Sequence, residues 1–153
     1  QGMWGPGVNL RKMDLTGAEH QYNIGRMHNG HMPGADISDS NFSRPNHQFY
    51  NWNLKGVVAV GTIFSTHNGG AALFNGKDGN FRKAVFKNMS IIKANFINAD
   101  LTGADFSESH FSSSTTFKRA NLTGVNWKGA RYDKSVVWDD GFDPKKAGLT
   151  LVK

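Results

Sequence analysis

The sequence is short of cysteine, proline and acidic side chains. It has no Cys, only 4 Pro, and 12 Asp and Glu against 18 Lys and Arg, which gives a formal net charge of +6. Without cysteine there is no disulfide framework, thiolate metal site or cysteine nucleophile, and the redox compartment stays open. No segment approaches the roughly 20 apolar residues that a membrane-spanning helix needs. The positive charge favours an acidic partner, which nucleic acid, anionic lipid or an acidic protein surface could supply.

Aromatic and turn-forming residues are abundant. The 153 residues correspond to one domain by length, but only 38% of them are apolar, which is lean for a two-layer globule. Eighteen Gly would ordinarily indicate loops, whereas 11 Phe and 4 Trp are too many for a solvated chain. The composition therefore indicates an ordered fold that is rich in turns.

Large apolar residues recur at every fifth position through the second half of the chain. Small residues, mostly alanine, tend to precede them by two positions. The series runs through Phe81, Phe86, Ile91, Phe96, Leu101, Phe106 and Phe111 and, after one extra residue near Ser112-Ser113-Ser114, through Phe117, Leu122, Trp127, Tyr132 and Val137. Because a period of five fits neither the 3.6 of a helix nor the 2.0 of a strand, it predicts a chain that turns a corner at each repeat.

The same period continues, with short insertions, through the first half. Its centres are Leu10, Leu15, His20, Met27, Met32, Ile37, Phe42, Phe49, Leu54, Ala59, Phe64, Gly69 and Phe74. Two-residue insertions separate His20 from Met27 and Phe42 from Phe49, at one corner of consecutive coils. They predict a bulge beside an otherwise flat face.

Several segments resemble the pentapeptide-repeat family, whose unit is A(D/N)LXX. They are Ala99-Asp100-Leu101-Thr102-Gly103, Ala104-Asp105-Phe106 and Ala120-Asn121-Leu122-Thr123-Gly124. The resemblance implies an all-β fold, a right-handed quadrilateral β-helix with four repeats per coil, in which the centre and the residue two before it point inward. We expect about six coils over residues 8–137, an N-terminal cap or leader at 1–7, and a C-terminal cap at 138–153 in which Trp138 and Phe142 cover the last ring.

Grouping the centres four at a time predicts four stacked faces with the strand spacing of roughly 4.8 Å. Face A holds His20, Phe42, Phe64, Phe86, Phe106 and Trp127, and face B holds Leu10, Met32, Leu54, Phe74, Phe96, Phe117 and Val137. Face C holds Leu15, Ile37, Ala59, Phe81, Leu101 and Leu122, and face D holds Met27, Phe49, Gly69, Ile91, Phe111 and Tyr132. Gly69 leaves one ring without its large side chain, so we expect that coil to be the least well packed.

The residues that could carry chemistry are few. His47 and His67 lie two before centres on face D, where they could hold a metal or simply fill the core, but no neighbouring inward position adds the third ligand that catalytic zinc usually has. His28 and His31 fall at outward positions. Asp100, Asp105 and Glu108 could be an acid and base pair, although Asp in such repeats more often bonds nearby backbone amides.

No nucleophile, nucleotide or metalloprotease motif occurs in the sequence. We therefore expect no enzyme activity, no catalytic, cofactor-binding or metal residue, and no cofactor. The enzyme alternative would need a metal at His47 and His67, or a cleft formed by insertions around residues 21–26, 43–48 and 75–80.

Two kinds of partner remain open. Lys77, Arg82, Lys83, Lys87 and Lys93 lie close together and could bind nucleic acid or another anionic surface through phosphate contacts, although Arg82, Lys87 and Lys93 follow centres on different faces. The family's DNA-mimicking members call for an acidic surface, which a charge of +6 opposes.

Our preferred hypothesis is a non-catalytic structural or interaction subunit. Its flat faces, with residues such as Trp4, Tyr50 and Arg131, would dock on a larger assembly. The tail Trp138-Asp139-Asp140-Gly141-Phe142-Asp143-Pro144 resembles the closing sequence of pentapeptide-repeat proteins from cyanobacteria and chloroplasts. That resemblance implies a photosynthetic membrane complex as host and the thylakoid lumen or periplasm as location.

Overall fold

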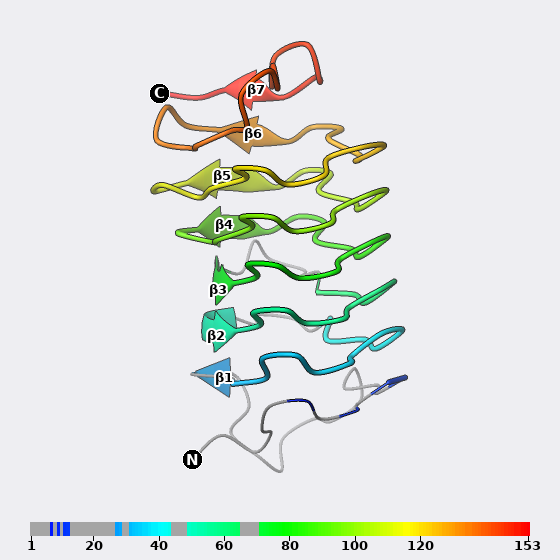
Figure 1. Cartoon of the computed structure of the whole chain (residues 1–153). Coiled ribbons are helices and arrows are strands. Elements are labelled where there is room, and N and C mark those ends of the chain that lie inside the picture. Colours follow the sequence, from blue (N-terminus) through cyan, green and yellow to red (C-terminus); the bar gives the residue numbers. More distant parts are fainter. Residues whose placement is uncertain are drawn as a thin grey trace.

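The computed structural model is a rod of stacked coils, with β1 near one end and β7 at the other (Figure 1). It describes residues 7, 9, 11–12, 27–28, 31–43, 49–64 and 71–153. Seven short strands form one parallel sheet in chain order: β1 (Met27–His28), β2 (Phe49–Asn53), β3 (Ala71–Asn75), β4 (Ser90–Ile92), β5 (His110–Ser112), β6 (Arg131–Tyr132) and β7 (Thr150–Leu151). Because consecutive strands are parallel neighbours, each connection is one complete turn of the coil. The expected right-handed quadrilateral β-helix is confirmed, and the described residues contain no helix.

A tight turn at the end of each repeat produces the period of five. The N–H of Ala84 donates to the carbonyl oxygen of Phe81 (3.1 Å), and Ala104 donates to Leu101 in the same way (2.9 Å). The residue before the donor has a left-handed backbone, with φ of 57° at Lys83 and 67° at Gly103. This combination is a type II turn, which bends the chain by one corner of the quadrilateral.

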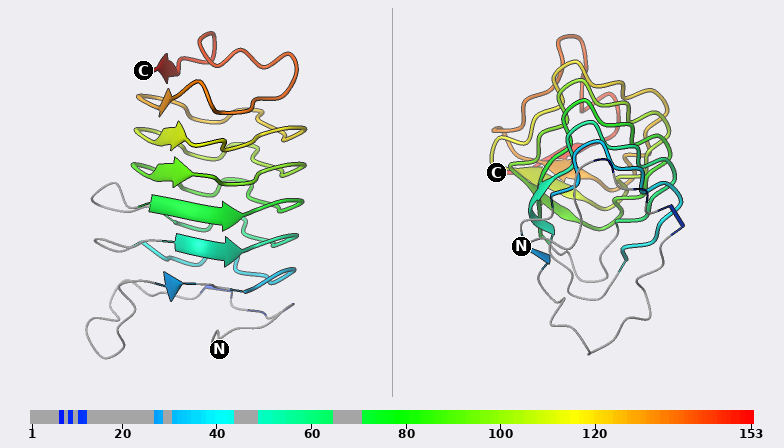
Figure 2. Two further views of the ribbon diagram at one scale, coloured as in Figure 1. Left: turned by 90° about the vertical axis from the view of Figure 1, so that its left-hand side faces the viewer. Right: turned by 60° about the horizontal axis from the view of Figure 1, so that its bottom comes forward.

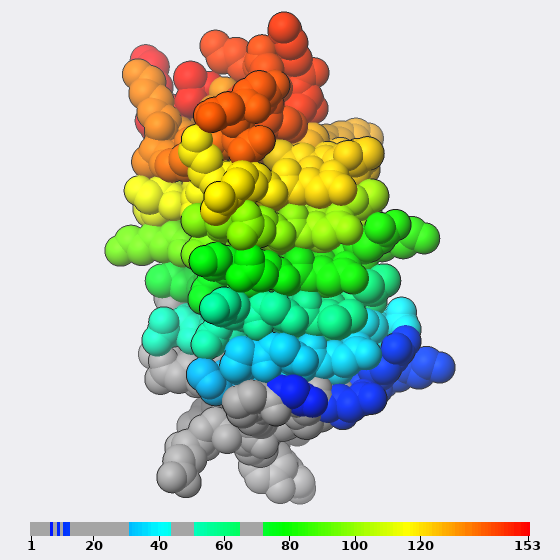
Figure 3. Space-filling model, in the orientation of Figure 1, coloured from blue at the N-terminus to red at the C-terminus, as the bar shows by residue number. Residues whose placement is uncertain are grey.

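The residue before each centre joins successive coils. On face C these residues pair in parallel from Asp36 to Val58, Asn80, Asp100 and Asn121. The hydrogen bonds are short, as in the 2.8 Å bond from the Phe81 N–H to the Asp100 carbonyl oxygen. The backbone is therefore paired along the rod axis on every face, which makes the faces flat and regular (Figures 2 and 3).

Face A confirms the predicted stack most directly. Phe42, Phe64, Phe86, Phe106 and Trp127 lie one above another as nearly parallel rings, with centroid separations of 5.8, 5.0, 4.7 and 5.3 Å. All five side chains are buried. The core is thus a continuous aromatic column, and each coil buries the ring of its neighbour.

Three predicted centres are wrong. Ala72, and not Gly69, pairs with Phe49 and Ile91 on face D, and Ala72 is fully buried, so the empty place that Gly69 predicted is filled. On face B, Asn75 pairs with Asn95, which makes Gly76 the centre in place of Phe74. At the last coil Trp138 replaces Val137, which is 40% exposed.

The large side chains of this region occupy the positions two before the centres. Trp52 and Phe74 pair in register and are 1% and 5% exposed, in positions where other coils carry Ala94 or Thr115. A Cβ on Gly76 would lie 2.9 Å from the ring of Phe81. The interior of this coil is therefore filled by a large side chain two residues before the centre and a small residue at the centre, the reverse of the arrangement in other coils. Residues 75–80 form a regular repeat, since Asn75 pairs with Asn95 and Asn80 with Asp100, so the insertion expected there is wrong.

The start of the described chain lies on a different face from the one that the series predicted, on face C where face B was expected. Asn9 pairs with Asp36, the residue before Ile37, so the chain at Asn9 lies on face C. The centres Leu10, Leu15 and His20 themselves lie outside the described residues, as do the insertion expected at 21–26 and, apart from Ser43, the one expected at 43–48.

The C-terminal segment covers the end of the aromatic columns. Trp138 stacks on Phe117 with a centroid separation of 4.8 Å, and Phe142 packs against Trp138 (5.0 Å) and Trp127 (5.9 Å). The chain then returns to the sheet as β7 beside β6. Phe142 thus packs over the last ring, whereas Trp138 belongs to that ring as the last centre of face B and does not cover it as expected; the boundaries at 7/8 and 137/138 stay predictions.

Candidate interaction surface

The carboxylates that could have formed an acid and base pair serve the turns. Asp100 accepts hydrogen bonds from the amide and hydroxyl of Thr102 (3.0 and 2.6 Å). Asp105 accepts from the amide of Ser107 (2.8 Å). Glu108 lies 3.5 Å from the ammonium group of Lys87 on the surface. These contacts match the structural role of such residues, in which a side-chain oxygen caps a turn amide.

The histidines give no metal site within the described residues. His31 is exposed, and its Nδ1 lies 3.4 Å from the Asn53 amide nitrogen. His47 and His67 lie outside the part of the chain that the structure describes. Where residues are described, no group of three His, Cys, Asp or Glu side chains is placed to hold a metal ion.

The basic cluster is divided among different faces. Arg82 on face C lies 3.5 Å from Asp100, and Lys87 on face A lies near Glu108 as above. Lys77 lies on face B, and Lys83 and Lys93 occupy left-handed corner positions. The large hydrophobic residues recorded as exposed within the described part of the chain are Val58, Val137 and Leu151, none of them aromatic. A single basic groove with stacking rings for nucleic-acid bases is therefore absent from the described surface.

Of the three residues that the sequence suggested for docking, Trp4 lies outside the described residues. Tyr50 belongs to β2, and Arg131 is exposed in β6. They are not brought together, because β3, β4 and β5 lie between the strand of Tyr50 and the strand of Arg131.

An apolar surface interrupts the polar faces around the corner between faces C and A. We call it the valine patch, and it consists of Val58, Val60, Ile63 and Val85. Val58 is 37% exposed, and the other three are partly exposed. In neighbouring coils the equivalent positions carry Asp36 or Asn80 for Val58, Ser38 or Arg82 for Val60, Asn41 for Ile63, and Asp105 for Val85.

The corner itself carries no side chain in this coil. It is formed by Gly61, which has a φ of 67°. The patch therefore extends from one face to the next, and such contiguous apolar surface with a polar rim is typical of protein interaction sites. The sequence alone did not single out this patch, although the register places all four side chains outward.

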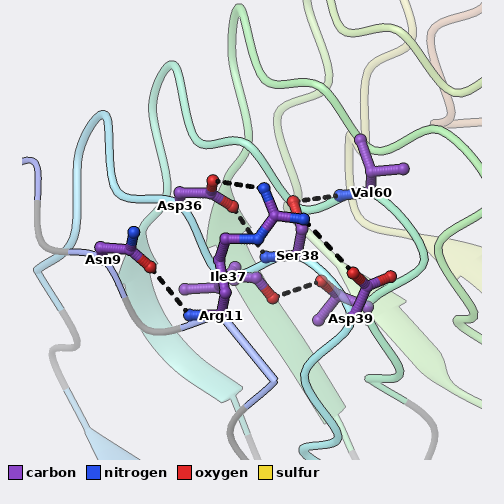
Figure 4. A network of polar contacts seen from close by, with 8 residues as sticks. Asn9, Arg11, Asp36, Ile37, Ser38, Asp39 and Val60 are labelled. Atoms are coloured by element: carbon purple, nitrogen blue, oxygen red, sulfur yellow. Dashed lines mark hydrogen bonds and ion pairs between the residues drawn. The ribbon is translucent and has the colours of Figure 1, made fainter.

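A polar network fixes one side of the valine patch (Figure 4). The guanidinium group of Arg11 lies 3.4 Å from Asp36 and 3.5 Å from Asp39. The Ser38 amide donates to Asp36 (3.0 Å), and the Val60 amide donates to the Ser38 hydroxyl (3.3 Å). Slight burial opposes ionisation of Asp36, but the Ser38 hydrogen bonds and Arg11 outweigh it, so the pKa of Asp36 lies below its ordinary value.

The opposite side of the patch is bounded by the ion pair of Arg82 and Asp100. Burial raises the pKa of Asp100, but the hydrogen bonds from Thr102 and the nearby Arg82 guanidinium together lower it below its ordinary value. The side chains of Arg11 and Arg82 are at least half exposed, so the ion pairs that they form with Asp36 and Asp100 add little to the stability of the fold. Their effect is to keep a charged rim around an apolar centre, which is the usual organisation of an interface.

Part of the chain matches a known family of repeats in sequence. A family model for pentapeptide repeats matches residues 80–115 with eight copies. Comparison with curated proteins gives no match. No helix of the described residues is long and apolar enough to cross a bilayer.

Solved structures with a similar course of the chain include two that are described as pentapeptide-repeat proteins. Rfr23 from the cyanobacterium Cyanothece 51142 is 19% identical with a TM-score of 0.38, over 88% of this chain and 86% of that one. Alr5209 from Nostoc PCC 7120 is 23% identical with a TM-score of 0.35, over 76% and 84%. QnrB1, a plasmid-mediated fluoroquinolone resistance protein, is 13% identical with a TM-score of 0.34, over 97% and 92%. At these values the likenesses assign no partner or activity.

The matched repeats have the type II turns and outward rungs described above, and the same ladder continues on both sides of them from Asp36 to Val137. Residues 80–115 therefore match the pentapeptide-repeat family, and the same β-helical ladder extends beyond them on both sides.

Proposed function

We propose that the protein is a non-catalytic interaction subunit that docks on a larger assembly through the valine patch. The observation that carries the proposal is the presence of Val58, Val60, Ile63 and Val85 at adjoining positions where neighbouring coils carry polar residues. Burying these side chains against a partner would remove apolar area from water at about 25 cal/mol per Å². The ladder of backbone hydrogen bonds holds the patch in place, so little ordering entropy opposes docking.

The host that we propose is a photosynthetic membrane complex, with the protein in the thylakoid lumen or periplasm. Support comes from the C-terminal residues Trp138 to Pro144, which resemble the closing sequence of cyanobacterial and chloroplast relatives. The patch and the host are separate statements, because the patch would serve any partner with a complementary apolar surface.

The test is a pull-down from native membranes with the tagged full chain, at low and high salt, followed by mass spectrometry. The key variant, V58N/V60T/I63N/V85N, puts at each position a residue type that neighbouring rungs already carry or closely match, so we expect the coil to tolerate it. The matched control is V137N, which removes another exposed valine from face B, where Asn95 occupies an equivalent rung.

We expect one complex to be recovered by the native chain and by V137N, to resist high salt, and to be lost from the patch variant. Equal recovery by the patch variant would refute docking through the patch. Recovery of nucleic acid alone, released by high salt, would instead favour a basic surface that binds phosphates. Recovery of a complex from membranes other than photosynthetic ones would reject the proposed host and keep the patch.

A further inference from the structure

One corner of the rod carries a notch where a residue is missing from the repeat. Between faces D and B the chain turns through left-handed Asn51 in one coil and left-handed Lys93 two coils further on, with φ of 58° and 53°. In the coil between them, β3 runs straight through the corner. Tyr50 pairs with Leu73 and Trp52 with Phe74, so Asn51 has no counterpart in β3. The two bulging corners thus flank a hollow of about 450 Å³.

The notch has an apolar floor and an amide rim. Leu73 and the nearly buried Phe74 lie at its base, and Asn53, Asn75, Asn95 and Lys93 lie around it. The volume is that of a small binding pocket, in the range of about 300–1,000 Å³. An aliphatic side chain is the kind of group that such a floor would accept.

The three asparagines of the rim form one column and present donors. The carbonyl oxygens of Asn53, Asn75 and Asn95 accept the amides of the residues two positions later, at 3.2, 3.2 and 2.9 Å. Their NH2 groups take no part in these bonds; that of Asn53 lies 3.4 Å from His31 Nδ1, whereas those of Asn75 and Asn95 have no hydrogen-bond partner within the described chain. A column of amide donors favours a ligand with acceptor oxygens.

Lysines beside the column add positive charge. Lys55 and Lys77 follow the asparagines by two positions in consecutive coils, and Lys93 stands at the notch. None of the three lies within 4.0 Å of a described carboxylate, in contrast to Lys87 and Lys118, which are paired. Among the described residues, the acid next to Lys77 is Asp78, which accepts a hydrogen bond from Asn98 (2.8 Å). Three cations and the amide donors therefore outweigh one carboxylate.

We propose that this corner, made of the notch with Lys55 and Lys77, binds an acidic peptide segment of a partner protein. Carboxylates of the segment contact the three ammonium groups and the asparagine amides, and one aliphatic side chain enters the notch against Leu73. A protein segment is favoured over nucleic acid because the apolar lining by Leu73 and Phe74 suits an aliphatic side chain, which a nucleotide backbone does not offer. The inference rests on the proposed function in taking a protein as ligand, but it concerns a different corner from the valine patch.

The test uses the full chain and a labelled ten-residue peptide of eight Glu and two Leu. The same peptide with Gln for Glu and a ten-nucleotide single-stranded DNA serve as comparisons. We expect binding of the acidic peptide at 50 mM salt, weaker binding at 300 mM because exposed charges are screened, and no binding of the Gln peptide. Fluorescence anisotropy gives each Kd.

Two variants separate this corner from general charge attraction. K55E/K77E/K93E should weaken peptide binding at least tenfold, whereas K12E/K83E/K128E, with the same change in net charge on exposed lysines of other surfaces, should weaken it less than threefold. Leu73→Ser should weaken it severalfold with the charges intact. Equal losses in the two triple variants, or DNA binding as tight as peptide binding, would overturn the proposal. Because the peptide assay does not involve the valine patch, its failure can be told apart from failure of the pull-down.

Discussion

Replacing Phe86 with alanine should remove a large part of the stability of the rod. Phe86 is 0% exposed and lies between Phe64 and Phe106, with ring centroids 5.0 and 4.7 Å away. Truncating a buried Phe costs about 3–5 kcal/mol, because transfer free energy is lost and a cavity remains. The stacked pairs on both sides, each worth about 0.5–1.5 kcal/mol, place the expected loss near the upper end of that range, at about 4–5 kcal/mol.

Urea unfolding followed by circular dichroism measures this loss. With a slope of about 2 kcal/mol per molar urea for a protein of this size, the midpoint should fall by roughly 2 M with the slope unchanged. Phe86→Leu should cost less than half as much, because it keeps most of the buried volume. Lys87→Ala is the matched control: it removes an exposed ion pair with Glu108 and should change the free energy of unfolding by at most about 1 kcal/mol. A loss below about 1.5 kcal/mol for Phe86→Ala would refute the view that the aromatic column supports the fold.

Two further predictions concern crowding and pH. Gly76→Ala should destabilise the protein by about 1–3 kcal/mol in urea unfolding, because the new Cβ would lie 2.9 Å from the Phe81 ring, and Phe81→Leu should relieve most of that penalty. The hydroxyl hydrogen bond from Ser135 is the main cause that lowers the pKa of Asp133 below its ordinary 3.8, against an opposing effect of burial. Asp133 therefore stabilises the fold above about pH 4 and loses this contribution as the pH falls through its folded-state pKa. In Asp133→Asn the fall of the urea midpoint between pH 5 and pH 2.5 should be shallower, and an unchanged profile would contradict the assignment.

The sequence predicted the fold well where the spacing of large residues is regular. From Phe81 to Tyr132 every predicted centre takes its expected place, because the type II turn fixes five residues per corner. The exceptions arise where an interval departs from five, as it does twice after Phe64 and once after Tyr132. Phe64 is followed by Ala72 eight positions later and by Gly76 four after that, whereas the series of fives placed Gly69 and Phe74 there.

A physical reason underlies this error. Both the centre and the position two before it face inward, so packing constrains their combined volume more than the place of either side chain. Phe74 with Gly76 fills the interior as Ala94 with Phe96 does in the next coil. Periodicity alone therefore misplaced the aromatic ring, and with it the missing corner residue that makes the notch.

The candidate surfaces could be predicted only in part. The register places Val58 and Val60 outward, so the valine patch was readable from the sequence once the faces were known. The notch was not, because it depends on β3 lacking a counterpart to Asn51, which the strand pairing shows. The acids at Asp100 and Asp105 were correctly interpreted as turn residues, since their spacing to Thr102 and Ser107 recurs throughout the repeats.

The most direct test of the interaction subunit is the amount of a native complex that the patch variant recovers, relative to the native chain. Quantitative mass spectrometry after the pull-down gives this ratio for V58N/V60T/I63N/V85N and for V137N, once circular dichroism shows both to be folded. Docking through the valine patch predicts a ratio below about one tenth for the patch variant and near one for V137N. Ratios near one for both variants would contradict it.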